Sequence, residues 1–122
     1  MIHREIQGTR VPALGFGTFR LPGDACREGV EQALALGYRH IDTAQGYDNE
    51  EEVGRGLAAA GVPRDEVFLV TKVMPSNFRR ADAIRSTRES LAKLGTDYVD
   101  LLLLHWPNPD VPVEETLDAL HE

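Results

Sequence analysis

Ionisable side chains of different types stand where short apolar runs of this sequence end. Asp42, Lys72 and His105 each close such a run, and Tyr47 lies a short distance beyond the first of them. A lysine at the end of an apolar strand is costly to bury unless it is paired, and Asp42 is its natural partner. A tyrosine near that lysine becomes a better acid because the cation favours the phenolate. With a neutral His105 orienting a carbonyl, the set predicts carbonyl reduction if a hydride donor is supplied.

The runs that carry these residues have the length and apolar content of β-strands. They cover residues 14–17, 38–42, 67–72 and 99–105. Stretches with apolar residues at helical spacing follow them. Their apolar positions are Cys26, Val30, Ala33 and Leu34, then Val53, Leu57 and Ala60, then Ile84, Leu91 and Leu94, and last Val113, Leu117 and Leu120. Because side chains alternate along a strand, we expect Asp42, Lys72 and His105 to point inward to one cavity mouth.

Repeated strand–helix units predict an α/β fold with parallel strands and right-handed crossovers. Either a doubly wound sheet or part of an eight-unit barrel fits this order. The last helical pattern is still running at Leu120 and the sequence stops at Glu122, whereas a (β/α)₈ barrel needs roughly 250 residues. We therefore expect residues 1–122 to form one partial barrel domain of about four β-α units, truncated in its fourth helix. A hairpin formed by residues 2–6 and 10–12 is expected before these units.

Helix boundaries are predicted from the residues that commonly cap helices. Glycines in the left-handed conformation are expected to end helices at Gly37, Gly61 and Gly95. Asp24 is the predicted N-cap of the first helix. A capping box at the start of the second helix is predicted from Asp48 with Glu51, or from Asn49 with Glu52.

The same residues lie within longer segments that form an ordered set. The segments are Gly17-Thr18-Phe19, residues 40–50 (HIDTAQGYDNE), Thr71-Lys72-Val73 and residues 97–107 (DYVDLLLLHWP). Together they closely resemble the aldo-keto reductase superfamily, and are most similar to bacterial members of the 2,5-diketo-gluconate reductase kind. The resemblance covers essentially the whole chain.

The resemblance implies a (β/α)₈ TIM barrel that reduces aldehydes and ketones with NADPH and without a metal. It implies that Tyr47 is the general acid and that Lys72 strengthens this acid. It further implies that Asp42 pairs with Lys72 and that His105 orients the substrate carbonyl.

The resemblance also implies binding residues. Gly17 and Thr18 are similar to the loop that lies against the cofactor, and Asp42 would lie close to its ribose. Positions that commonly line the substrate pocket are matched by Phe19, Met74 and Trp106. In the family, the groups that grip the rest of the cofactor come mainly from later β-α units, so this chain is expected to lack most of the cofactor cradle.

Other readings of the same residues remain open. The ionisable set could be a buried ion pair of structural value only, and the chain could be a non-catalytic fragment or interaction module. A metal-dependent barrel hydrolase using His40, Asp42 and His105 is a further alternative, although Lys72 would compete with a metal ion for the carboxylate. Because an open sheet leaves two edge strands unpaired, we expect self-association or complementation by a C-terminal half.

Composition excludes several classes of function. The chain has 122 residues and a formal net charge of −7, which disfavours a nucleic-acid partner. No apolar run is long enough to span a bilayer, and the N-terminus carries charges where a signal peptide needs an apolar core. The single Cys26, expected to be buried packing, excludes an intramolecular disulfide. A cytoplasmic location is therefore expected.

Overall fold

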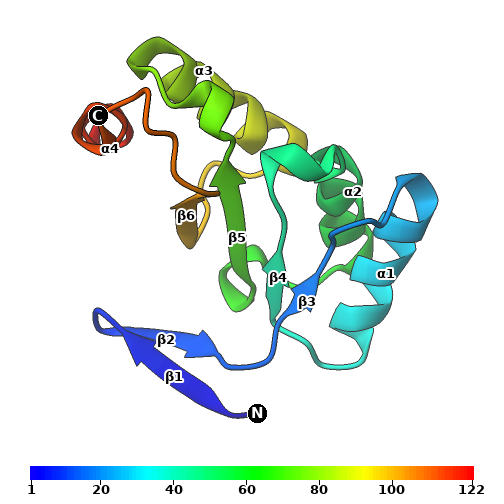
Figure 1. Cartoon of the computed structure of the whole chain (residues 1–122). Helices are drawn as coiled ribbons and strands as arrows, with labels where there is room; N and C mark the ends of the chain where they lie inside the picture. Colours follow the sequence, from blue (N-terminus) through cyan, green and yellow to red (C-terminus); the bar gives the residue numbers. More distant parts are fainter.

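A computed structural model describes residues 1–122, in which an antiparallel hairpin precedes a parallel sheet flanked by helices (Figure 1). The strands are β1 (His3–Ile6), β2 (Thr9–Pro12), β3 (Phe16–Gly17), β4 (His40–Asp42), β5 (Phe68–Val73) and β6 (Leu101–Leu104). The helices are α1 (Gly23–Ala35), α2 (Glu50–Ala60), α3 (Arg80–Leu94) and α4 (Val113–His121), with short 3-10 turns η1 (Gln45–Tyr47), η2 (Arg64–Glu66) and η3 (Pro75–Asn77). None of these helices combines the length and apolar character that crossing a membrane requires.

The four-stranded sheet has the order β3-β4-β5-β6, and every neighbouring pair is parallel. Each strand is followed by a helix before the next strand begins, so the predicted β-α order and the predicted hairpin are confirmed. The hairpin lies across the end of the sheet where the strands begin, opposite the end where they point (Figure 1). The carboxyl ends of β3, β4, β5 and β6 therefore face one rim of the molecule.

The two faces of the sheet are covered differently. Ile41 and Leu69 are fully buried against the helices in a cluster with Cys26, Val30 and their neighbours. On the opposite face, Phe68 and Val70 form a smaller cluster with Val11 of the hairpin and Leu101. Because side chains alternate along β5, Lys72 shares the face of Phe68 and Val70, while Thr71 shares the face that packs against the helices.

The strands β3, β4 and β6 each begin two residues later than predicted, and for β4 and β6 the reason lies at the end of the sheet near the hairpin. β4 begins at His40 because Tyr38 still belongs to the end of α1, where its backbone N–H donates to Ala33 O at 2.9 Å. β6 begins at Leu101 because the Asp100 carboxylate, rather than a backbone carbonyl, accepts the N–H of Leu69 at 2.9 Å. β3 is also shorter than predicted, and covers only Phe16–Gly17 of the run 14–17.

The predicted helix ends are confirmed, but the predicted start of α1 is wrong. Gly37, Gly61 and Gly95 all have positive φ angles at the ends of their helices. α1 begins at Gly23, whose own φ of +50° turns the chain into the helix. Asp24 therefore lies inside the first turn, where its charge is favourable at the positive end of the helix dipole, and it does not cap the helix.

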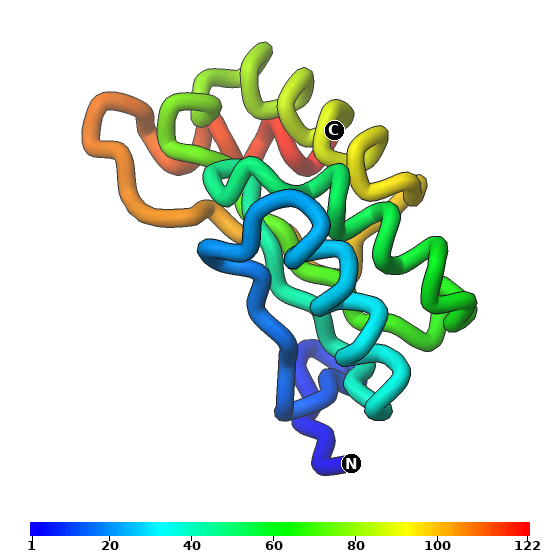
Figure 2. Tube along the Cα trace, turned by 90° about the vertical axis from the view of Figure 1, so that its right-hand side faces the viewer, coloured from blue at the N-terminus to red at the C-terminus, as the bar shows by residue number.

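α2 lies between α1 and α3 (Figure 2), and glycines permit this close packing. A Cβ atom added at Gly54 would stand 2.4 Å from the Lys93 carbonyl oxygen of α3. A Cβ added at Gly56 would stand 2.8 Å from the Arg27 carbonyl oxygen of α1. The absence of side chains at these positions therefore brings both neighbouring helices against α2.

We expect Gly54→Ala to lower the free energy of unfolding by about 1–2 kcal/mol. The new methyl group must displace backbone atoms of α3, which costs about 1–3 kcal/mol, and alanine recovers up to about 1 kcal/mol through helix propensity. Urea unfolding followed by circular dichroism measures the change. Gly17→Ala is the matched control because a Cβ there meets nothing within 4 Å. Equal stability of the two variants would contradict this packing account.

Candidate active site

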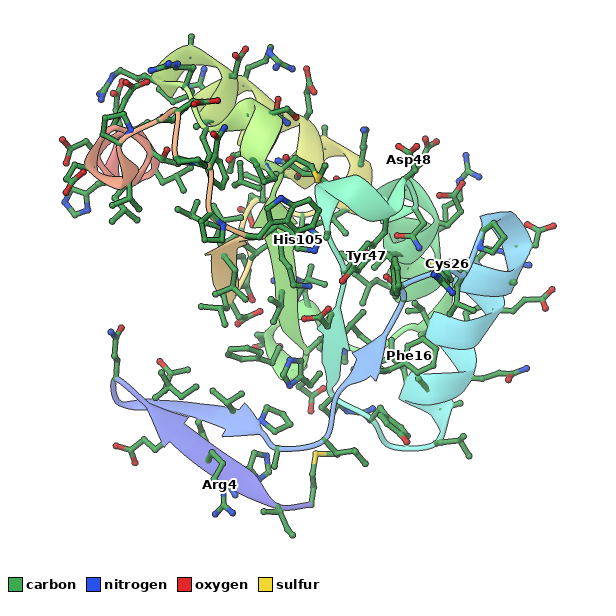
Figure 3. All side chains as sticks on the ribbon, viewed as in Figure 1. Arg4, Phe16, Cys26, Tyr47, Asp48 and His105 are labelled. Atoms are coloured by element: carbon green, nitrogen blue, oxygen red, sulfur yellow. The ribbon has the colours of Figure 1, made fainter.

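The rim at the carboxyl ends of the strands gathers the four ionisable residues singled out from the sequence. Asp42 is the last residue of β4, Lys72 is the last but one of β5, and His105 directly follows β6. Tyr47 ends η1, the short turn beyond β4. Figure 3 shows Tyr47 and His105 at this rim, whereas Asp48 points outward. The structure therefore brings together residues that are separated by up to half of the chain.

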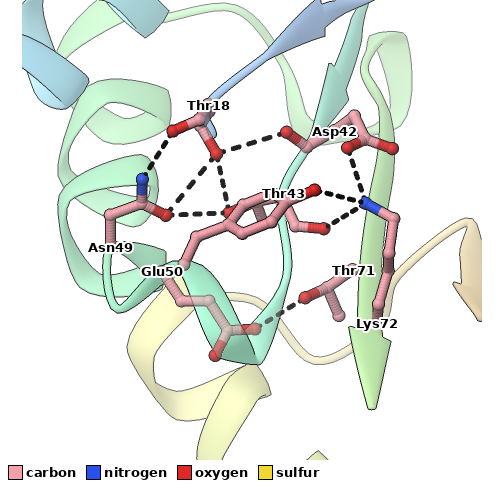
Figure 4. A network of polar contacts seen from close by, with 8 residues as sticks. Thr18, Asp42, Thr43, Asn49, Glu50, Thr71 and Lys72 are labelled. Carbon is pink, nitrogen blue, oxygen red and sulfur yellow. Dashed lines mark hydrogen bonds and ion pairs between the residues drawn. The ribbon is translucent and has the colours of Figure 1, made fainter. Parts of the chain in front are cut away.

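Lys72 is the centre of this group. Its ammonium nitrogen lies 2.6 Å from Asp42 Oδ1 and 3.0 Å from the Thr43 carbonyl oxygen (Figure 4). It also lies 3.4 Å from the Tyr47 hydroxyl. An ammonium group has three N–H donors, and each of these oxygens can accept one of them. The Lys72 side chain is only 13% exposed. Its charge is thus held away from bulk water by one carboxylate, one backbone carbonyl and one phenol.

Aromatic rings fix the position of the Tyr47 phenol. The Tyr47 ring packs on Phe19, with ring centroids 5.1 Å apart, and meets His105 edge to face at 5.6 Å. His105 in turn packs on Trp106 at 4.3 Å. Edge-to-face and tilted contacts of this kind are favourable for aromatic rings at such separations. The hydroxyl of Tyr47 is thereby directed to the Lys72 ammonium.

The surroundings of His105 favour its neutral form. Burial lowers the pKa of this imidazole below its usual value of 6.5, the nearby Lys72 ammonium lowers it further, and Asp42 opposes the shift. The Nδ1 atom of His105 is buried and has no hydrogen-bond partner. Because no acceptor is available at Nδ1, the single ring proton is better placed on Nε2.

Asn49 binds the loops of the rim together and does not cap α2. It occupies the N-cap position, but its side chain makes no capping hydrogen bond. Its amide nitrogen donates to the Thr18 carbonyl oxygen at 2.8 Å, and its amide oxygen accepts from Thr43 at 3.0 Å (Figure 4). The same amide nitrogen also donates to the Leu21 carbonyl oxygen at 3.0 Å. The predicted capping box is therefore wrong, because the same side chain ties α2 to the loop after β3.

The residues predicted to contact a cofactor differ in exposure. Thr18 is fully buried, and its hydroxyl donates to Thr43 Oγ1 at 2.9 Å. Gly17 is exposed at the end of β3, with open space where a side chain would stand. Asp42 uses Oδ1 for Lys72 and is 34% exposed. Of these three residues, only Gly17 and Asp42 are therefore accessible to a molecule bound at the rim.

The residues predicted to line a substrate pocket surround the phenol on different sides. Phe19 and Trp106 are 60% and 51% exposed and pack on Tyr47 and His105. Met74 lies over Gly46, close enough that a Cβ at Gly46 would meet its sulfur at 2.5 Å. A cavity of about 420 Å³ opens beside His105, and of these three residues only Trp106 lines it.

His40 does not join a metal site with Asp42 and His105. Its Nδ1 atom lies 2.9 Å from the Pro12 carbonyl oxygen, and its ring packs against Phe68 at 5.1 Å. No group of three or more histidine, cysteine, aspartate or glutamate side chains is arranged to hold a metal ion. The hydrolase alternative thus lacks the third ligand on which it depended.

Several polar residues at the rim were missed by the sequence analysis. Thr43 supplies a carbonyl oxygen to Lys72, and Gln45 and Glu50 make buried or half-buried hydrogen bonds beside Tyr47. The signal in the sequence was the polar character of residues 42–50, a segment in which Ala44 and Gly46 are the only exceptions.

Cys26 is buried, as predicted. Burial, together with the nearby Glu52, raises the pKa of its thiol to about 11.

We expect an NMR titration to give His105 a pKa below 6.5, and Lys72→Met to raise it. Removing the ammonium eliminates one cause of the lowered pKa and leaves the favourable Asp42 charge unpaired. Because the pKa of His105 is lower in the folded chain than in the unfolded chain, the imidazole binds its second proton more tightly when the chain is unfolded. The part of the stability due to neutral His105 is therefore complete above pH of about 6.5 and is lost as the pH falls below it. His105→Gln identifies the resonance, and a wild-type pKa above 6.5 would contradict this electrostatic assignment.

Comparison with known proteins identifies the family to which the chain is related. Residues 13–122 match the model of the aldo/keto reductase family. The chain is 54% identical over 114 residues to the methylglyoxal reductase DkgB of Escherichia coli O157:H7, covering 92% of this chain and 43% of that protein. Among solved structures, it superimposes on a putative 2,5-diketo-D-gluconic acid reductase B with a TM-score of 0.89 and 56% identity, covering 93% of this chain and 40% of that one.

A Bombyx mori aldo-keto reductase in complex with NADP is similar at a TM-score of 0.89 and 36% identity, with 98% of this chain and 45% of that chain covered. This chain thus spans less than half the length of the relatives it matches. Its hairpin and parallel β-α units match the N-terminal half of aldo-keto reductase TIM barrels, as predicted, and a doubly wound sheet is excluded. The chain belongs to the aldo-keto reductase family.

Proposed function

We propose that this chain supplies the proton-transfer centre of an NADPH-dependent carbonyl reductase, with Tyr47 as the general acid. The observation that carries the proposal is the Lys72 ammonium, which lies 3.4 Å from the Tyr47 hydroxyl and 2.6 Å from Asp42. The proposed substrates are small aldehydes and ketones. Methylglyoxal is the first substrate to test, because a relative with 54% identity is a methylglyoxal reductase.

In the proposed reaction, each residue of the rim has a separate task. Tyr47 gives its proton to the carbonyl oxygen as that oxygen becomes an alkoxide, and Lys72 stabilises the phenolate that remains. Asp42 pairs with the ammonium and orients it. His105 in its neutral form donates a hydrogen bond from Nε2 to the same substrate oxygen and so orients the carbonyl.

The residues present fit one end of a nicotinamide cofactor. The second carboxylate oxygen of Asp42 has no hydrogen bond within the chain and can accept one from a ribose hydroxyl. Gly17 borders open space, which lets a flat ring approach the backbone. When bound, NADPH supplies the hydride that adds to the carbonyl carbon. The free oxygen of Asp42 and the open space at Gly17 support the proposed cofactor binding by these two residues, and Thr18 holds their loops together.

A second candidate is a non-catalytic module that keeps the fold without holding cofactor. The observation that favours it is the open sheet, in which β3 and β6 each pair with only one neighbour. Self-association or a complementing C-terminal half would pair these edges. Titration with NADPH, followed by its fluorescence, separates the two candidates, and sedimentation of the same samples shows which assembly binds.

We expect Tyr47→Phe to lower methylglyoxal turnover by about 100-fold or more while NADPH binding is retained. The variant keeps the aromatic packing on Phe19 and His105 but removes the proton that the alkoxide must receive, and general acid catalysis is worth about 10²–10⁴ in rate. Steady-state oxidation of NADPH at 340 nm measures the change.

Tyr98→Phe is the matched control because its ring lies over Arg64, away from the rim. This control should keep the activity of the unmodified chain. Retained turnover in Tyr47→Phe would remove Tyr47 from the mechanism. Failure of the folded chain to bind NADPH in any assembly would favour the non-catalytic module instead.

A further inference from the structure

The segment that carries Tyr47 is joined to the segment after β5 by one side chain. Gln45 Oε1 accepts two hydrogen bonds, from the backbone N–H of Met74 at 2.9 Å and from Asn77 Nδ2 at 3.0 Å. The close packing of Met74 on Gly46 is an independent sign that the two segments are in direct contact. Gln45 thus fixes the position of a loop that borders the proposed substrate site.

The same side chain begins a relay of hydrogen bonds that runs back to β5. Gln45 Nε2 lies 3.3 Å from Ser90 Oγ of α3, and Ser90 Oγ donates to Glu50 Oε1 at 3.1 Å. Glu50 Oε2 accepts from Thr71 Oγ1 of β5 at 2.7 Å (Figure 4). Ser90, Glu50 and Thr71 are 2%, 4% and 0% exposed. Breaking any link leaves a buried polar group unpaired, so the relay resists deformation.

The relay closes a ring that contains both Lys72 and Tyr47. Thr71 and Met74 stand on either side of Lys72 in the sequence, and Gln45 and Glu50 stand on either side of Tyr47. The hydrogen bonds of the relay therefore hold both ends of each short segment. The 3.4 Å contact between Lys72 Nζ and Tyr47 OH lies between these two restrained segments.

We propose that Gln45 is a positioning residue, which sets the distance between the Tyr47 hydroxyl and the Lys72 ammonium through this relay. The inference rests on the proposed function of Tyr47 as a general acid. Gln45 itself does not face the Lys72 ammonium, and it acts by restraining the backbone on both sides of the pair. No other side chain of η1 bonds to the segment after β5.

The direct test is Gln45→Met, because methionine has a similar length and offers neither the amide donor nor its acceptor. Amide hydrogen exchange at Met74 should become about tenfold faster, as one buried hydrogen bond is lost. The NOE between the Lys72 ε-methylene and the Tyr47 ring protons should weaken. The kcat for methylglyoxal should fall by about tenfold or more with a smaller change in KM, because a displaced acid slows the chemical step.

Conservative variants separate positioning from general loss of structure. Gln45→Glu keeps an oxygen that accepts from Met74, so the protection of that amide should be retained while the link to Ser90 is lost. Ser90→Ala leaves the contacts of Gln45 with Met74 and Asn77 in place, and should weaken only the NOE between Lys72 and Tyr47. Gln32→Met is the matched control, because Gln32 is exposed on α1 and its side chain makes no hydrogen bond.

The exchange and NOE measurements need no enzymatic activity. Unchanged Met74 protection and an unchanged NOE in Gln45→Met would overturn the positioning role, whatever the turnover. Absence of NADPH binding and turnover by the wild-type chain in every assembly, together with the predicted exchange and NOE changes, would refute the proposed function, and the structural role of Gln45 would stand.

Discussion

The rest of the rim depends on the hydrogen bonds that the partly buried Lys72 ammonium donates. A charge that is only 13% exposed needs acceptors for its protons, and the chain supplies them from Asp42, Thr43 and Tyr47. These acceptors come from β4 and the turn beyond it. The requirement to satisfy one cation thus determines where the end of β4 and the η1 turn must lie, and it places a phenol against an ammonium.

The alternation of β5 links this rim to the core of the fold. Lys72 points to the face shared with Phe68 and Val70, whereas its neighbour Thr71 points to the helices and bonds to Glu50. The strand therefore carries the reactive cation on one side and an anchor for α2 on the other. Gly54 and Gly56 allow α2 to pack between α1 and α3. This packing holds in place the helix that carries Glu50.

The parts of the structure set by local pattern could be predicted from the sequence. Apolar runs located the strands, period-two alternation put Asp42 and Lys72 on one face, and the glycines at 37, 61 and 95 marked helix ends. The polar contacts could not be predicted in this way. Asn49 has the sequence of a helix cap, but its partners are carbonyls of the loop after β3, which only the folded chain brings near. Gln45 likewise meets Met74, Asn77 and Ser90 across large sequence separations.

One charged contact, between the Lys72 ammonium and the Asp42 carboxylate, holds the proposed acid in place, and a double-mutant cycle measures this contact most directly. Asp42→Asn and Lys72→Met are made singly and together, and the free energy of unfolding is determined for each. Each single variant leaves one buried partner unpaired, so the loss in the double variant should be smaller than the sum of the two by about 1 kcal/mol or more. Strictly additive losses would mean that the ammonium and the carboxylate do not hold each other, and would contradict the central role given to Lys72.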